Sequence, residues 1–290
     1  MPSTLQFLPV VDSAELAAAR RRELDIDRAL AAKLGGSAVA AIQRGSYTGP
    51  DGAEVDWREA VTAAVASKRT IPPAYGLPQR PGVTFPVTTV QVSNETTLAA
   101  ASRLTRAGLR PLALNFANGV APGGGFLTGA RAQEEGLCRS SALFATLDGD
   151  PMYKAHRPRA LPDSTDWAIL SPRVPVFRLD DGTPLPAPWL LDFITCAAPY
   201  APKVGAERSA ELLAARIERV LAVARATWYD TLVLGAWGCG AFGNDPLRTA
   251  QDFRRALEGP YLGAFQHVAF AITDWSAERR FLGPFRDVFA

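Results

Sequence analysis

The sequence predicts an α/β protein in which a mostly parallel or mixed β-sheet is covered by helices on both faces, giving three layers. After residue 85, apolar runs of strand length alternate with amphipathic helix patterns, the order expected of such a sheet. Before residue 85 the patterns are helical, and residues 71–86 hold five prolines and two glycines, a composition typical of a linker. We therefore predict an N-terminal helical portion over residues 1–85, packed on the core, and an α/β domain over residues 86–290. A chain of 290 residues suits this organisation.

The N-terminal portion contains two predicted helices. The first covers residues 12–34, with Asp12 or Ser13 as its N-cap and a glycine pair at positions 35 and 36 as its end. Ile26, Leu30 and Leu34 recur at four-residue steps, which predicts an apolar stripe along it. A turn-rich link over residues 45–52 separates it from the second helix, predicted over residues 55–68.

The second portion contains six predicted strands and four predicted helices. The strands cover residues 87–92, 111–116, 167–177, 190–198, 231–234 and 268–273. The helices cover residues 96–107, 134–145, 205–228 and 247–257. In sheets of this class, ligands bind beyond the carboxyl ends of the strands. Two glycine-rich loops follow predicted strands, so both are expected at that edge.

The first loop, residues 119–135, contains three consecutive glycines, Gly123, Gly124 and Gly125, and ends in two adjacent acids, Glu134 and Glu135. Glycines let a ligand approach the backbone closely, and a loop that runs into a helix start can cradle phosphate oxygens. Carboxylates repel phosphates, so the pattern fits a large ligand with its phosphates on the glycines and an uncharged reacting bond at the acids. The alternative is a tight loop followed by acids that complement the helix dipole.

The second loop covers residues 235–243. Gly238, Gly240 and Gly243 match G-x-G-x-x-G, but this fingerprint belongs to the first strand–helix turn of a larger fold, and fewer than fifty residues follow here. Neither loop has the Gly-Lys-Ser/Thr ending of a P-loop. We therefore interpret the two glycine loops as backbone cradles that together have the size for a diphosphate. Phe242 at the tip can either pack or lie against a sugar ring.

The bulk properties favour a cytoplasmic protein that binds neither membranes nor nucleic acid directly. The net charge of +2 is too small to indicate a nucleic-acid or membrane surface, and no apolar run has the length of a bilayer span. Three scattered cysteines suggest reduced thiols, and the N-terminus lacks a secretory pattern. The two histidines, His156 and His267, are far apart in sequence, so we expect no metal site and no cofactor.

At these motifs the sequence resembles the poly(ADP-ribose) glycohydrolases of the macrodomain superfamily, in their compact bacterial form. Three glycines, seven further residues and then Gln133-Glu134-Glu135 match the family signature. Residues 114–118 resemble the ribose-binding segment of macrodomains, and residues 235–243 resemble the diphosphate-binding loop. The resemblance covers roughly residues 15–275 and implies a macrodomain-like fold. It also implies hydrolysis of the ribose–ribose O-glycosidic bonds of poly(ADP-ribose), which reverses ADP-ribosylation in the DNA damage response.

The resemblance also implies roles for individual residues. Glu135 would be the general acid and then the base, and Glu134 would orient the ribose hydroxyls. Gln133 would fix the loop, Asn118 would bind the distal ribose, and Glu95 would recognise adenine unless it only caps the next helix. The expected diphosphate ligands, together with the aromatic that presses on the terminal ribose, are Gly123, Gly124, Gly125, Gly238, Cys239, Gly240, Ala241 and Phe242.

Residue chemistry adds one constraint and leaves alternatives open. Ordinary glycosidases place two carboxylates on opposite sides of the bond, about 5–9 Å apart. Adjacent residues point in different directions and cannot flank a sugar, so one acid must both give and take the proton. A non-catalytic ADP-ribose reader and a hydrolase of other ADP-ribose conjugates remain possible. The expected partner is poly(ADP-ribose) or an ADP-ribosylated protein, and a monomer is expected.

Overall fold

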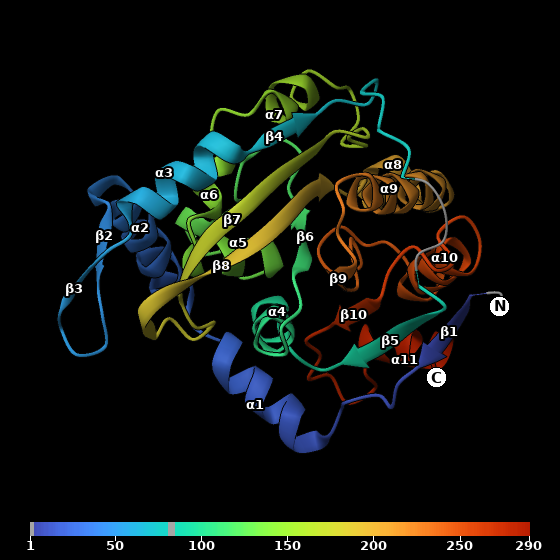
Figure 1. The fold of residues 1–290 in the computed structure, drawn as a ribbon, viewed down its shortest axis with the longest axis horizontal. Helices are drawn as coiled ribbons and strands as arrows, with labels where there is room; N and C mark the ends of the chain where they lie inside the picture. Colours follow the sequence, from blue (N-terminus) through green and yellow to red (C-terminus); the bar gives the residue numbers. More distant parts are fainter. Residues whose placement is uncertain (1–2, 81–84) are drawn as a thin grey trace.

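The central feature of the fold is a mixed β-sheet that runs through the whole molecule (Figure 1). The computed structural model describes residues 3–80 and 85–290. Within these residues the sheet has eight strands, in the order β1 (Thr4–Phe7), β5 (Val87–Ser93), β10 (His267–Ala271), β9 (Thr231–Leu234), β6 (Pro111–Ala117), β8 (Pro184–Ala197), β7 (Ala168–Arg178) and β4 (Arg69–Ile71). The strands from β1 to β8 in this order are parallel, and β7 and β4 are antiparallel to their neighbours. The predicted mixed α/β class is confirmed.

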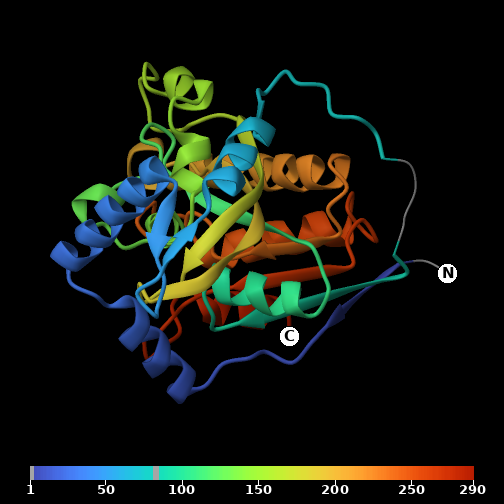
Figure 2. The ribbon, with the colours of Figure 1, turned by 60° about the vertical axis from the view of Figure 1, so that its left-hand side comes forward.

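Helices cover both faces of the sheet, as Figures 1 and 2 show from two sides. Against one face lie α9 (Ala206–Ala226), α10 (Pro246–Glu258) and α11 (Leu282–Val288). Against the other lie α3 (Arg58–Ser67), α4 (Thr97–Arg106), α5 (Gln133–Ser140) and α6 (Leu143–Leu147). The remaining elements are α1 (Ala14–Leu24), α2 (Arg28–Arg44), β2 (Ser46–Thr48), β3 (Glu54–Asp56), the short 3₁₀ helix η1 (Phe126–Thr128), α7 (Pro151–His156) and α8 (Ala201–Val204).

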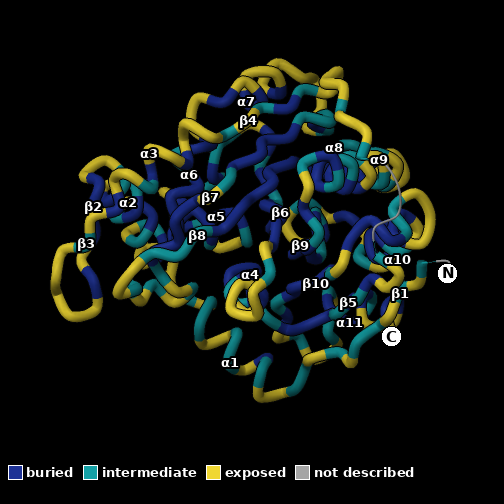
Figure 3. Tube along the Cα trace, in the orientation of Figure 1, coloured by how far each residue is buried: buried dark blue, intermediate teal, exposed yellow. Residues whose placement is uncertain are grey.

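Strand β6 shows why the sheet needs both layers. Its alternate residues Leu112 and Leu114 pack in the core on the α9 side, whereas Ala113 between them packs in the core on the α4 side. Successive residues of a strand point to opposite faces, so an apolar run such as this one is buried on both. The central strands are accordingly buried along most of their length (Figure 3).

The N-terminal portion contains strands that the sequence patterns did not reveal. Strand β1 pairs with β5 at one edge of the sheet, and β4 pairs with β7 at the other edge. Strands β2 and β3 form a separate hairpin in place of the predicted link over residues 45–52. Residues 81–84 of the predicted linker lie outside the described residues. The division into two portions at residue 85 stays a prediction.

The predicted first helix, residues 12–34, was wrong in its bounds. The chain forms α1 and then α2, with Asp27 as the N-cap of α2, and α2 continues to Gly45, which has the left-handed conformation of a C-terminal cap. Gly35 does not end the helix. It is buried against η1, where an added Cβ would stand 2.5 Å from the carbonyl oxygen of Phe126. A glycine is therefore needed here for close contact inside a helix.

The predicted apolar stripe on this segment was wrong as well. Leu30 is 40% exposed. The buried face of α2 is made of small residues, namely Ala31, Gly35, Ala38 and Ala41. Small side chains let α2 approach η1 and α5, and so it covers the first glycine loop closely.

The predicted elements after residue 85 are present, with three kinds of difference. Strand β8 begins at Pro184, six residues before the predicted start at residue 190. The helix predicted over residues 134–145 is divided into α5 and α6, because Ser141 is extended and forms a β-bridge with Val176. The short helices α7, α8 and α11 were not predicted. Among the described residues, no helix combines the length and apolar character needed to cross a bilayer.

The adjacent glycines of α2 provide a matched test of this packing. We predict that Gly35→Ala lowers the free energy of unfolding by about 1–3 kcal/mol, because the added methyl group displaces η1. Gly36→Ala meets no atom within 4 Å and should raise the free energy of unfolding by up to about 1 kcal/mol through helix propensity. Chemical denaturation of both variants measures the two effects. Equal effects would contradict the close contact at Gly35.

Candidate active site

A cavity of about 350 Å³ opens at the carboxyl edge of the sheet, beyond β6 and β9. Because these strands are parallel neighbours, the two glycine loops that follow them meet at this edge. Nine of the predicted site residues line the cavity: Glu95, Asn118, Gln133, Glu134, Glu135, Gly238, Gly240, Ala241 and Phe242. The other four, Gly123, Gly124, Gly125 and Cys239, do not line it.

Glu134 is the more deeply buried of the two adjacent acids. It lies in the first turn of α5 and is 3% exposed. Its Oε2 accepts a hydrogen bond from the backbone N–H of Asn118 (2.7 Å), and its Oε1 accepts one from the side-chain amide of Asn115 (3.4 Å). Burial raises the pKa of Glu134 to about 8. The hydrogen bond from Asn118 lowers this pKa, and the charge of Glu135 raises it further. Glu134 is therefore largely protonated at neutral pH.

Glu135 has one engaged oxygen and one free oxygen. Its Oε1 accepts a hydrogen bond from the backbone N–H of Gly125 (2.9 Å). Its Oε2 is shielded from solvent and has no hydrogen-bond partner among residues 3–80 and 85–290. An unpartnered buried oxygen is costly, and a proton on it or a ligand group bound to it removes the cost.

The glycine triplet holds the two acids. Gly123 and Gly124 both have positive φ angles, which glycine adopts readily. A Cβ on Gly124 would stand 2.3 Å from Glu135 Oε1 and 3.0 Å from Glu134 Oε2. The two carboxylates thus converge on one backbone position, although adjacent helical residues were expected to point apart. In this structure the triplet lies behind the acids.

Gln133 ties the helix carrying the acids to the end of β6. Its side-chain oxygen accepts a hydrogen bond from the N–H of Phe116 (2.9 Å), and its amide donates to the carbonyl of Leu114 (2.7 Å) and to Thr97 (3.1 Å). Three elements, β6, α4 and α5, are therefore fixed to one another by one side chain. This is the geometry expected of a residue that fixes the loop.

Asn244, which the sequence analysis did not select, fixes the second glycine loop to its neighbours. The amide of Asn244 donates to the carbonyls of Pro199 (2.9 Å) and Gly238 (3.1 Å), and its oxygen accepts from Ser209 (2.7 Å). Cys239 is buried, with its thiol directed to the Trp237 carbonyl. The backbone N–H of Cys239 donates to the carbonyl of Ala236 (3.2 Å), so Cys239 supports the loop and does not line the cavity.

Phe242 lies at the tip of this loop and lines the cavity. Its ring packs edge-on against Tyr200, with centroids 5.7 Å apart, and its backbone oxygen accepts a hydrogen bond from Ala201 (2.9 Å). The backbone of α8 thus supports the position of Phe242.

The far end of the cavity carries further charged groups. Glu95 is ion-paired with Arg103 (2.6 Å) and accepts a hydrogen bond from Ser93 (2.5 Å), and the N-cap of α4 is Thr96. Arg139, one turn after Glu135 on α5, is buried and lines the cavity. Burial lowers the pKa of Arg139, and the charges of Glu135 and a neighbouring aspartate oppose this effect.

Sequence reasoning missed Asn115, Asn244 and Arg139. Asn115 is a polar residue inside the apolar run of β6, and this could have been noticed as a signal. Asn244 and Arg139 carry no such signal, because their partners are backbone carbonyls and a serine hydroxyl that only the folded chain brings to them. Of the two histidines, His156 is buried and bonded to the Gly119 carbonyl (3.0 Å) and Thr165 (2.8 Å). In the part of the chain that is described, no group of three or more His, Cys, Asp or Glu side chains is placed to hold a metal ion.

Comparisons with known proteins agree with this geometry. Residues 36–179 match the family model of the microbial-type poly(ADP-ribose) glycohydrolase catalytic domain. The solved poly(ADP-ribose) glycohydrolase from Thermomonospora curvata is 40% identical, with a TM-score of 0.83, and the match covers 89% of this chain and 98% of that chain. A structure of the same relative bound to the inhibitor ADP-HPD matches with a TM-score of 0.81 at 40% identity over the same shares of the two chains.

A second bacterial relative is also similar. The poly(ADP-ribose) glycohydrolase from Deinococcus radiodurans, in complex with ADP-ribose, is 41% identical, with a TM-score of 0.73 over 79% of this chain and 96% of that chain. No match was found among curated proteins. Identity of this level over nearly the whole of each relative shows the family as well as the fold. The chain therefore belongs to the microbial-type poly(ADP-ribose) glycohydrolase family.

Proposed function

We propose that this enzyme hydrolyses the ribose–ribose O-glycosidic bonds of poly(ADP-ribose) and releases ADP-ribose. The observation that carries the proposal is that Glu135 lines the cavity while its buried Oε2 has no hydrogen-bond partner among the described residues. A reader that only binds ADP-ribose has no need for a buried carboxylate oxygen without a hydrogen-bond partner. A proton donor at the bond to be broken requires one.

Glu135 acts first as a general acid and then as a general base. The proton on Oε2 passes to the glycosidic oxygen as the bond from C1″ of the terminal ribose to that oxygen breaks. Water then attacks C1″, and Glu135 takes the proton that the water loses, so the acid is restored. The products are ADP-ribose and a polymer chain shorter by one unit.

Glu134 orients the substrate in this mechanism. Both of its oxygens are held by hydrogen bonds from Asn118 and Asn115, which leaves the carboxyl group fixed beside the reacting bond. A fixed carboxyl group can hold ribose hydroxyls in a reactive pose.

The remaining groups bind the rest of the substrate. Backbone N–H groups of the second loop, at Gly238 and from Gly240 to Phe242, take the diphosphate, and Phe242 lies against the terminal ribose. The negative diphosphate then helps to stabilise the oxocarbenium-like transition state. Asn118 binds the distal ribose. Glu95 recognises adenine while it keeps its ion pair with Arg103. The cytoplasmic location, the monomeric state and a role in the DNA damage response stay predictions.

The roles of the two acids predict different defects in two matched variants. Glu135→Gln keeps the shape but loses the proton, so we expect turnover of polymer to fall by ~10⁴-fold, the upper end of acid–base contributions, with ADP-ribose affinity within a few-fold of wild type. Glu134→Gln should fall by ~10²-fold through lost positioning. Turnover and calorimetric ADP-ribose binding are measured side by side. Near-normal turnover by Glu135→Gln would mean that another group is the acid.

The raised pKa of Glu134 predicts a pH dependence of stability. Between about pH 4.5 and 8 the folded protein holds a proton on Glu134 that the unfolded chain has released. The stability of the ligand-free protein should therefore decrease as the pH rises through this window, by at most about 1.4 kcal/mol per pH unit. Glu134→Gln, which cannot ionise, should remove this part of the slope. Parallel slopes for wild type and variant in chemical denaturation would contradict the assignment.

A further inference from the structure

A second surface of unusual composition lies at the opposite edge of the sheet from the cavity. It consists of Arg69, Arg110, Arg173 and Trp228, and we call it the remote surface. Arg110 immediately precedes β6, Trp228 lies three residues before β9, Arg69 begins β4, and Arg173 lies at the bulge of β7. With strands about 4.8 Å apart, the five adjacent strands from β9 to β4 span roughly 19 Å.

Arg110 is exposed but rigidly held. Its side chain is 66% exposed. Its Nε donates to Asp192 (2.7 Å), its Nη2 donates to the hydroxyl of Tyr229 (3.1 Å), and its guanidinium lies 4.7 Å from the centre of the Tyr229 ring. Burial raises the pKa of Tyr229, and the charge of Arg110 opposes this effect. Arg69 pairs with Leu170 of β7, three residues before Arg173. An arginine held in this way loses little freedom when it binds an anion.

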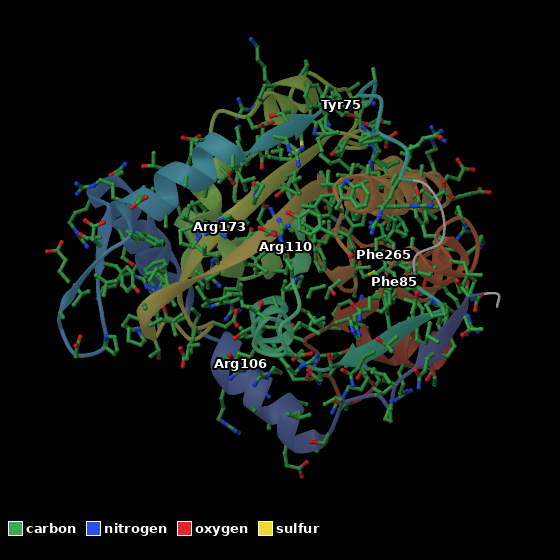
Figure 4. All side chains as sticks on the ribbon, in the orientation of Figure 1. Tyr75, Phe85, Arg106, Arg110, Arg173 and Phe265 are labelled. Carbon is green, nitrogen blue, oxygen red and sulfur yellow. The ribbon has the colours of Figure 1, made fainter. Side chains whose placement is uncertain are left out.

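Arg173 is the second arginine of the remote surface. Its φ of +55° is in the left-handed region, where a residue with a side chain is strained. The strain is maintained by its backbone N–H, which donates to Asp192 Oδ1 (2.6 Å), so one carboxylate holds the side chain of Arg110 and the backbone of Arg173. The two arginines are neighbours in Figure 4. Most left-handed positions of this chain are glycines, so a strained arginine here points to a use for its side chain.

Within residues 3–80 and 85–290, no ion pair neutralises the charge of Arg69 or of Arg173. Neither side chain has an ion pair or a hydrogen bond to any residue in the described ranges. Besides Asp192, the acids Asp56 and Glu59 line a depression together with Arg173 without forming an ion pair. They mark the end of the remote surface on the α3 side.

Trp228 adds an exposed aromatic group to the remote surface. It is 64% exposed, the largest exposed fraction among the large apolar side chains of the described residues. Its φ of +66° is also in the left-handed region. The guanidinium of Arg80 lies 4.5 Å from the ring centre on one side, and Arg80 is itself ion-paired with Asp230 (2.6 Å). The ring is thus supported on one face and presented to solvent.

We propose that the remote surface binds a distal segment of the poly(ADP-ribose) chain whose end is in the active site. The proposal rests on the proposed function. One held arginine and two unpaired arginines beside a supported, exposed aromatic ring are a combination that holds single-stranded polyanions with bases, through phosphate contacts and base stacking. Each ADP-ribose unit supplies both an adenine and a diphosphate, so the polymer matches the remote surface in chemistry.

The geometry sets what this second contact does. Strand β6 separates the two sites, and its seven residues span roughly 20 Å, so one ADP-ribose unit in the cavity does not occupy both. A long chain can engage both sites, which raises the effective concentration of its end at the active site. A dimer of ADP-ribose cannot gain in this way. The remote surface should therefore favour long chains through KM, leaving kcat unchanged.

The test compares hydrolysis of long polymer and of the ADP-ribose dimer by the active full-length enzyme. The variants are Trp228→Gly and the double change Arg69→Ser with Arg173→Gly. Both glycine changes relieve left-handed strain, so the melting temperature should not fall. We expect kcat/KM on long polymer to decrease by about tenfold, the effect of losing a stacked base or two phosphate contacts, with kcat/KM on the dimer unchanged. The long-chain preference of the wild type should also decrease with added salt.

The matched control is Arg255→Ser with Arg286→Ser, which removes two exposed arginines of α10 and α11 and should leave both substrates unaffected. If wild type cleaves both substrates and the remote-surface variants have the wild-type kcat/KM on long polymer, the inference fails while the proposed function stands. Equal losses on polymer and dimer would also overturn it, as would competition by oligoadenylate as strong as that by polymer. If wild type cleaves neither substrate, the proposed function fails and the inference fails with it.

Discussion

Backbone amides that hold two adjacent buried carboxylates are the interaction on which the site depends. The N–H of Gly125 binds Glu135, and the N–H of Asn118 binds Glu134. Buried acids without such donors would be costly, and the donors point correctly only if the loop takes left-handed angles at Gly123 and Gly124. The glycine triplet is therefore required to support the acids, whatever else it contacts. The packing of α2 at Gly35 against η1 closes the same loop from outside.

The sheet turns this local arrangement into a site for a large ligand. Strands β6 and β9 are parallel neighbours, so the loop with the acids and the loop with Phe242 face one cavity. Gln133 and Asn244 fix the two loops to the ends of the strands. The same arrangement separates the cavity from the remote surface by the length of β6. One end of the sheet thus binds the reacting bond, while the other end is available to bind more of the polymer.

The sequence could predict what depends on local pattern. The strands β5 to β10, the longer helices α4, α9 and α10 and the pairing of two glycine loops follow from periodicity and parallel topology. Strands β1 and β4 could not be predicted, because these short edge strands lack the fully buried apolar run that marks β9. The glycines at 35 and 36 were misread because a helix-ending glycine and one that allows close packing look alike in sequence. Asn244 depends on contacts that only the folded chain creates.

The central claim is that the protein breaks a glycosidic bond by adding water at C1″. The most direct measurement is incubation with poly(ADP-ribose) in ¹⁸O-labelled water, followed by mass spectrometry of the products. The account predicts ADP-ribose that carries one ¹⁸O atom, on the hydroxyl of C1″, with both phosphates unlabelled. Label in a phosphate would indicate cleavage of the diphosphate instead, and polymer recovered intact would indicate a protein that only binds it. Either result would contradict the account.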